Sequence, residues 1–153
     1  MVVRPSQPSD ASQVVQMVKE IFRTEFSKDQ SAYPTEDLEH LSETYAGPAS
    51  TFLIAEDDSK VVGTCGVKAE SPQTAILRRL FVASSHRSKG VGSKLLEEAL
   101  RFCRQKGFKE VIIRTSTRMQ AAIRLCSVAG FKEEGRWTLG EVTLVRLRLK
   151  LSS

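Results

Sequence analysis

Residues 87–92, which read Arg-Ser-Lys-Gly-Val-Gly, have the residue types and spacing of a site for a phosphate group. Residues 91–103 carry apolar side chains at helical spacing, so the glycines stand at the start of a helix. The first amides of a helix have no partner inside it, and the helix dipole makes that end positive. Glycine also lets the backbone come close to an anion. The segment therefore predicts an anion site at a helix N-terminus, with a simple turn as the alternative.

Two common phosphate motifs do not fit this segment. A P-loop needs Gly-x-x-x-x-Gly-Lys-Ser/Thr, but Ser93 and Lys94 follow Gly92 in the opposite order. No glycine stands five positions before Gly92 either. The dinucleotide fingerprint needs a third glycine, and Leu95 occupies that place. The sequence excludes both motifs and leaves a phosphate site of another kind.

The elements that must position this segment alternate between strand and helix patterns. Residues 51–55 and 60–67 predict a hairpin, and residues 75–114 predict a strand–helix–strand crossover with one parallel step. Further helices are expected from about residues 10, 35 and 119. Further strands are expected at residues 2–4, between residues 130 and 142, where Trp137 lies near a turn, and over 142–149. We therefore predict an α/β (α+β) fold in a single domain over residues 1–153. It has a mixed, mostly antiparallel central sheet of about six or seven strands with helices on both faces.

Composition narrows the classes of function. The chain has 153 residues, a net charge of +5 and three cysteines without paired spacing. No apolar run approaches the ~20 residues of a membrane span, and the N-terminus lacks an apolar signal segment. We expect a cytoplasmic protein with free thiols, no bound metal and no membrane partner. The cationic residues are scattered and no nucleic-acid motif is present, so DNA binding is only a minor alternative.

The glycine segment and a second segment downstream together resemble the signatures of a known family. Residues 80–96 resemble the Arg/Gln-x-x-Gly-x-Gly/Ala signature of the GNAT superfamily of N-acetyltransferases, which follows a strand. Ala122, Leu125 and the pair Gly130-Phe131 resemble its second signature, a helix that ends in Gly-Phe. The resemblance covers essentially the whole chain in element order and is strongest over residues 75–131.

The resemblance implies acetyl-coenzyme A as cosubstrate, with no metal. In this family the strand before the loop separates from its neighbour at a bulge, and its free backbone groups bind the pantetheine arm. A backbone amide of that strand can polarise the thioester carbonyl, and the loop amides hold the pyrophosphate. The cosubstrate-binding residues implied in this chain are Leu80, Phe81, Val82, Arg87, Ser88, Lys89, Gly90, Val91, Gly92 and Ser93. Either Lys89 or Lys94 is expected to reach the ribose phosphate.

Three positions depart from the family pattern. Many relatives have a tyrosine that protonates the departing thiolate, and here Cys126 stands there as the candidate catalytic residue. A buried apolar role or an acyl-Cys intermediate are its alternatives. Ile76 replaces a glutamate that serves some relatives as base or water holder, and Met119 replaces an asparagine that bonds coenzyme A. The possible substitutes for the base are a water chain or the side chains of Glu25, Glu56, Tyr33 and Tyr45.

Four side chains around the predicted site have two possible roles each. Arg78 and Arg79 are adjacent on a strand and are expected to face opposite sides. One of them either pairs with a carboxylate in the substrate cleft or lies on the sheet under a helix. Phe26 and Tyr33 lie in the region that shapes the acceptor site in this family, or they anchor a surface loop.

We predict an N-acetyltransferase that moves an acetyl group from acetyl-coenzyme A to a primary amine of a small molecule or a protein. The amine attacks the thioester directly in a ternary complex. The alternative is a coenzyme A-binding sensor or interaction module with little or no activity, which the residues at Cys126 and Ile76 favour. The resemblance also implies a homodimer, because members of this family often dimerise through C-terminal strands, and the alternating residues 142–149 offer an edge strand.

Overall fold

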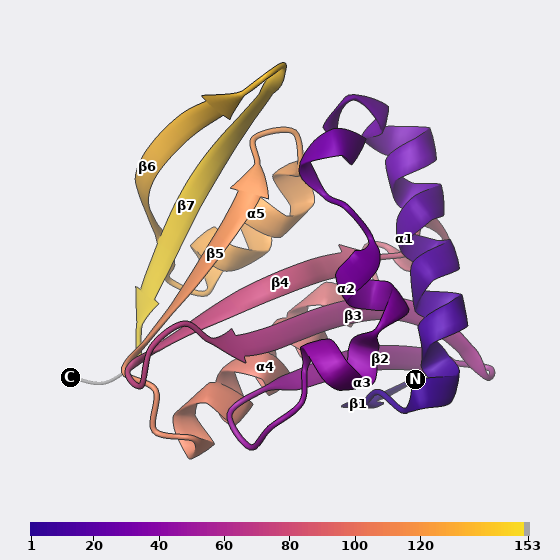
Figure 1. Ribbon diagram of the computed structural model, residues 1–153, viewed down its shortest axis with the longest axis horizontal. Helices are drawn as coiled ribbons and strands as arrows, with labels where there is room; N and C mark the ends of the chain where they lie inside the picture. The colour runs from indigo at the N-terminus through magenta and orange to yellow at the C-terminus, as the bar shows by residue number, and fades with distance from the viewer. Residues whose placement is uncertain (152–153) are drawn as a thin grey trace.

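The computed structural model describes residues 1–151, without the side chains of residues 30–32, and it is built on one seven-stranded sheet (Figure 1). The strand order is β1-β2-β3-β4-β5-β7-β6, and every neighbouring pair is antiparallel except β4 and β5. This confirms the predicted mixed sheet and its single parallel step. The strands are β1 (Val2–Pro5), β2 (Thr51–Asp57), β3 (Lys60–Ala69), β4 (Thr74–Val82), β5 (Glu110–Ser116), β6 (Lys132–Leu139) and β7 (Val142–Lys150).

Helices cover both faces of the sheet, and each side has its own apolar core (Figure 1). One core lies under α4 and α5, and the other lies under α1, α2 and α3. Within residues 1–151, none of the helices combines the length and apolar content needed to span a bilayer. The helices are α1 (Ala11–Glu25), α2 (Glu36–Glu39), α3 (Leu41–Thr44), α4 (Val91–Gln105) and α5 (Gln120–Val128), and the short 3-10 turns are η1 (Pro8–Asp10), η2 (Ser27–Ala32) and η3 (Ser84–His86).

The start of α4 rests directly on β3 at Gly63. A Cβ atom at this position would lie 2.7 Å from the Leu95 Cδ1 atom, 3.0 Å from the Val91 Cγ1 atom and 3.3 Å from the Phe81 carbonyl oxygen. Only glycine leaves room for this approach, which fixes the N-terminus of α4 close to the sheet. The predicted anion site is therefore held by the core rather than by a free loop.

β4 and β5 separate after the middle of β4. Their parallel pairing ends at Leu77 and Ile113, and the two strands diverge beyond that point (Figure 1). A bulge lies at the same place on the other side of β4, where Arg79 has a φ of 59° and the register with β3 shifts. The Thr64 hydroxyl donates to the Arg79 carbonyl at 2.6 Å and secures the bulge. The second half of β4 therefore has no strand partner on its β5 side.

Three details differ from the expectations drawn from the sequence. The helix expected to start near residue 35 and to end at residues 47–48 is two short helices, because His40 between them has φ −127° and ψ 50°. Residues 142–149 do not form an edge strand, because β7 lies between β5 and β6. The alternating polar positions of β7 do not face water alone: Arg146 and Arg148 pair with Glu134 of β6, each at 2.7 Å.

Candidate functional site

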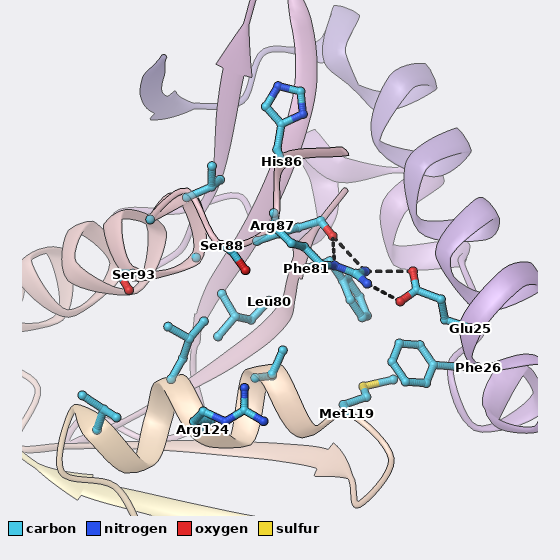
Figure 2. Close-up of a pocket in the computed structure, with 18 of the residues that line it drawn as sticks. Glu25, Phe26, Leu80, Phe81, His86, Arg87, Ser88, Ser93, Met119 and Arg124 are labelled. Atoms are coloured by element: carbon cyan, nitrogen blue, oxygen red, sulfur yellow. Dashed lines mark hydrogen bonds and ion pairs between the residues drawn. The ribbon is translucent and has the colours of Figure 1, made fainter. Parts of the chain in front are cut away.

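A cavity of ≈730 Å³ lies where the N-terminus of α4 meets the separated end of β4 (Figure 2). Its walls come from the end of α1, the second half of β4, the loop after β4, the first turn of α4 and one side of α5. Every residue predicted to bind the cosubstrate lines this cavity except Lys89, which is exposed on the loop. Residues up to 13 positions apart, from Leu80 to Ser93, thus come together on one wall.

The loop turns sharply so that the first turn of α4 faces the cavity. Ser88 and Gly90 have positive φ values of 61° and 81°, and a Cβ atom at Gly90 would meet nothing within 4 Å. Glycine is therefore needed at position 90 for its backbone conformation rather than for space. The Lys94 amide donates to the Gly90 carbonyl at 3.0 Å and starts the helical hydrogen bonds. The amides of residues 91–93 precede that bond and are available to an anion.

Gly92 brings α4 against α5 at the back of the cavity. A Cβ atom there would lie 2.6 Å from the Leu125 Cδ1 atom and 3.5 Å from the Val82 Cγ2 atom. Gly92 is buried, whereas Gly90 is exposed. The two glycines of the segment therefore have different roles: Gly90 turns the chain, and Gly92 allows close packing of two helices.

Arg87 does not extend freely into the cavity. Its Nε and Nη2 atoms donate to the Val82 carbonyl at 3.2 and 3.1 Å, and its Nη2 atom also donates to the Glu25 carboxylate at 2.8 Å (Figure 2). A second contact joins Nη1 to the other Glu25 oxygen. Glu25 is the last residue of α1, so this ion pair links the end of α1 to the loop of residues 87–92 at the wall of the cavity.

Two more arginines line the cavity, and the sequence reasoning did not select them. Arg124 lies on the face of α5 that also carries Ala121 and Leu125, and Arg118 lies just before that helix. Arg118 pairs with the buried carboxylate of Asp29. The spacing of residues 121, 124, 125 and 128 could have indicated this face, since it is one side of a helix. Glu25 is the one carboxylate among the residues that line this cavity.

Cys126 lies on the opposite side of α5 from the cavity. It is 0% exposed, packs in the core under α4 and α5, and does not line the cavity. Burial raises the pKa of its thiol to about 12. This position favours the apolar packing role over the proton-donor role. Met119, in contrast, lines the cavity, and its sulfur accepts a hydrogen bond from the Thr115 hydroxyl at 3.2 Å.

A second cavity of ≈630 Å³ lies on the side of the sheet that α2 covers. Its walls include β4 residues 76–79, the segment around Tyr33, Arg114 of β5, and Trp137 of β6. Arg78 and Arg79 both line it, so the expectation that they face opposite sides was wrong. The bulge breaks the alternation of β4 at this point. The two cavities are lined by consecutive stretches of β4, residues 76–79 for the second and residues 80–82 for the first, with the bulge at the junction.

Arg79 is buried and pairs with a carboxylate of this chain. Its Nη2 atom lies 2.6 Å from Asp37 Oδ1, and its Nε atom donates to Asp37 Oδ2 at 3.1 Å. Burial alone would raise the pKa of Asp37, but the hydrogen bonds and charge of Arg79 outweigh it and the pKa is lowered. The Tyr45 hydroxyl donates to the same carboxylate at 3.2 Å. Arg79 therefore holds α2 on the sheet. Of its two expected roles, this matches an arginine that lies on the sheet under a helix.

The four substitutes considered for a base lie in different places. Glu56 pairs with Arg4 at 2.8 Å on β2, away from both cavities, and Tyr45 is tied to Asp37. Glu25 lies in the first cavity but is tied to Arg87. Tyr33 lines the second cavity, and Phe26 lines the first. The structure thus brings only Glu25 and Tyr33 to the cavities, one to each.

Comparison with known proteins agrees with this arrangement. The sequence model of the acetyltransferase (GNAT) family matches residues 15–131. A probable N-acetyltransferase, camello, from Xenopus laevis is 37% identical over 112 residues, which are 71% of this chain and 51% of that protein. Human N-acetyltransferase 8 is 34% identical over 106 residues, which are 65% of this chain and 47% of that protein. The chain spans about half the length of these curated relatives.

Solved structures share the whole fold at lower identity. An acetyltransferase of the GNAT family from Staphylococcus aureus has a TM-score of 0.87 at 20% identity, with 99% of both chains covered. A putative acetyltransferase from Salmonella typhimurium, solved with its cofactor acetyl-CoA, has a TM-score of 0.82 at 19% identity and covers 100% of this chain and 95% of its own. These likenesses establish the fold.

Proposed function

Because this chain belongs to the acetyltransferase (GNAT) family, we propose that it moves an acetyl group from acetyl-coenzyme A to a primary amine. One observation carries the proposal: the free amides at the start of α4 and the unpaired half of β4 face the same cavity. Coenzyme A has a pyrophosphate and an arm with two amides, and it needs a partner for each part. The site offers an anion-binding helix terminus and a strand edge at the two required places.

In this proposal the amides of residues 91–93 hold the pyrophosphate, with Ser88 and Ser93 adding hydroxyls. The arm lies along β4 from Val82 towards Leu80 and takes the place of a missing strand beside it. The positive charge of Arg87, Arg118 and Arg124 suits a ligand with several phosphates. Lys89 is exposed at the rim and is suited to the ribose phosphate, as is Lys94, which lies 3.2 Å from Glu98.

The acceptor amine approaches from the second cavity, on the other side of the gap between β4 and β5. The protein then has three tasks: to bring the neutral amine to the thioester carbon, to polarise the carbonyl with an amide of β4, and to stabilise the departing thiolate. Cys126 takes no part in these steps, because its thiol is buried away from the cavity. The acceptor is a small molecule or a protein amine. The cytoplasmic location and a homodimer stay predictions from the sequence.

A coenzyme A-binding sensor is the second candidate. The observation that favours it comes from the first cavity, which offers no free acid or base: Cys126 does not line the cavity, and Glu25 forms an ion pair with Arg87. A sensor needs only the binding features, whereas a transferase also needs an open route for the amine. The second cavity, at ≈630 Å³, offers space for an acceptor amine and favours the transferase.

A two-step experiment tests the proposal. Thermal unfolding is measured with acetyl-coenzyme A, coenzyme A and NAD as control. Ligand at about 100 times Kd should stabilise the protein by ~2.7 kcal/mol, or roughly 5–10 °C at this length. Release of the coenzyme A thiol is then followed with a panel of amines. No shift with either form of coenzyme A would refute the binding site, and a shift without thiol release would support the sensor.

A further inference from the structure

Tyr33 has a buried hydroxyl group without a partner. Within the part of the chain that the structure describes, no atom lies in hydrogen-bonding geometry with this oxygen, although the oxygen itself is shielded from solvent. The other tyrosine, Tyr45, behaves in the ordinary way, since its hydroxyl donates to Asp37 at 3.2 Å. Buried hydroxyls without partners are rare because each loses its hydrogen bonds to water and gains none in return.

The position of this hydroxyl is the gap where β4 leaves β5. It lies beside the Thr115 side chain and the Ser116 backbone of β5, beyond the last β4–β5 pair at Ile113. The Tyr33 ring packs on Phe22 with 5.2 Å between centroids, and Phe22 packs in turn on Phe81 at 5.5 Å. Phe81 lines the first cavity and Tyr33 lines the second, so the ring of Phe22 connects a residue of one cavity to a residue of the other.

The environment keeps this hydroxyl protonated. Burial raises the pKa of Tyr33, and this outweighs the neighbouring Thr115 and Ser116 groups, which favour ionisation. The negative charge of Asp29 adds to the rise, and the positive charge of Arg79, whose Cζ atom lies 6.0 Å from the ring centroid, opposes it. A protonated hydroxyl that has no partner is a donor available to an acceptor.

We propose that the Tyr33 hydroxyl is a catalytic hydrogen-bond donor to the thioester sulfur as it leaves. The inference rests on the proposed transferase activity, which places the thioester in the gap between β4 and β5. Tyr33, which lies between η2 and α2, would then stabilise the departing thiolate, a task that Cys126 of α5 cannot perform because it is buried in the core. The unpartnered state of the hydroxyl is then the resting state of a site whose acceptor arrives with the substrate.

The chemistry balances without a further reactant. The amine nitrogen forms a bond to the carbonyl carbon, and the carbon–sulfur bond breaks with its electron pair going to sulfur. Tyr33 donates its hydrogen bond to that sulfur while the charge develops and keeps its own proton. The attacking nitrogen gives one proton to water, and the thiolate takes one from water as it leaves. The products are the amide and coenzyme A.

Two matched variants test this role, Tyr33→Phe and Tyr45→Phe. Each removes one buried hydroxyl from the same side of the sheet and leaves the ring in place. Thermal unfolding, coenzyme A binding and the turnover number for thiol release are measured for both variants and for the wild type. The amine used is whichever member of the panel the wild type acetylates fastest, with water as acceptor when no amine reacts.

Tyr33→Phe should lower kcat by about 100-fold, since loss of one such donor typically costs 10²–10³. Its Tm should be unchanged or higher, because a hydroxyl without a partner is removed, and its Kd for coenzyme A should be unchanged. Tyr45→Phe should show the opposite pattern, a lower Tm with unchanged kcat. Wild-type turnover in Tyr33→Phe would overturn the role of Tyr33 and leave the transferase standing. A wild type that releases no thiol would overturn both.

Discussion

Replacing Glu25 with glutamine should tighten the binding of coenzyme A. The Glu25 carboxylate holds the Arg87 guanidinium at the wall of the first cavity, while the same guanidinium caps the Val82 carbonyl. A bound pyrophosphate has to share Arg87 with the Glu25 carboxylate or displace that carboxylate. In either case the negative pyrophosphate lies close to the negative charge of Glu25. Glutamine keeps the shape and one hydrogen-bonding oxygen but removes the charge.

The size of the effect follows from Coulomb's law. A phosphate and a carboxylate on the same guanidinium lie roughly 6 Å apart. Glu25 and Arg87 have side chains that are 29% and 36% exposed, so the local dielectric lies between that of water and that of a protein interior. An effective dielectric of about 40 gives a repulsion of ~1.4 kcal/mol at that distance, which is about tenfold in Kd. Screening at physiological salt reduces the gain to a few-fold.

The assay is calorimetric titration of coenzyme A into both proteins at low and high ionic strength. Glu20→Gln is the matched control, because it makes the same change in net charge on the same helix. Glu20 pairs with Arg23 on the exposed side of α1 and does not line the cavity. Glu25→Gln should lower Kd about tenfold at low salt and less at high salt, whereas Glu20→Gln should leave it unchanged.

An unchanged or weaker affinity in Glu25→Gln would refute this reasoning. Weaker binding would mean that the ion pair prepares the loop for the ligand, so that Glu25 helps rather than competes. A gain of the same size in both variants would mean that net charge alone is responsible. Stability does not confuse the comparison, since a half-exposed ion pair contributes only about 0–1 kcal/mol.

Three further variants test other parts of the structure. Cys126→Ala should keep its kcat and lose about 1 kcal/mol of stability, and a 100-fold loss of turnover in a folded variant would restore a catalytic role for the thiol. Gly63→Ala should destabilise the protein by about 1–3 kcal/mol in urea unfolding, because α4 must move off β3, whereas Gly135→Ala, with nothing within 4 Å of its Cβ position, should not. Asp37 has a lowered pKa, so the stability it contributes is present above its unfolded pKa of about 3.9 and is lost as the pH falls through its lower folded value. The unfolding midpoint of the wild type should therefore decrease below about pH 4, and that of Asp37→Asn should decrease less. If the midpoints of both proteins decrease equally with pH, the Asp37–Arg79 pair is not the cause of the lost stability.

The turn at Gly90 and the start of α4 were predictable because their signal is local. Gly90 must adopt a positive φ, the helix after it has a clear apolar face, and both requirements appear within about 15 consecutive residues. The order of strands and helices was predictable for the same reason, since each element shows its own period in the sequence. The parallel pairing of β4 with β5 was predictable as well, because residues 75–114 show the strand–helix–strand pattern of a crossover unit.

The details that the sequence missed depend on contacts between distant residues. β7 looked like an edge strand because its arginines alternate with apolar residues, but those arginines pair with Glu134 across the sheet. Arg79 was expected on one face of a regular strand, but the Thr64 hydroxyl and the Asp37 carboxylate hold it at a bulge. No local sequence pattern predicts a positive φ at an arginine, because the free-energy cost of that backbone conformation is offset by contacts with residues far along the chain.

The bulge at Arg79 has consequences for both cavities at once. It turns the second half of β4 away from β5, which leaves the backbone from Leu80 to Val82 unpaired in the first cavity. It also brings Arg79 onto Asp37, and this fixes α2 and the segment of Tyr33 beside the second cavity. One backbone distortion therefore places the edge proposed for the cosubstrate and the hydroxyl proposed to act on it. A change that straightened β4 would lose both the unpaired strand edge and the position of the Tyr33 hydroxyl. The distortion costs of order 1–3 kcal/mol, so the proposed site explains it better than the stability of the sheet does.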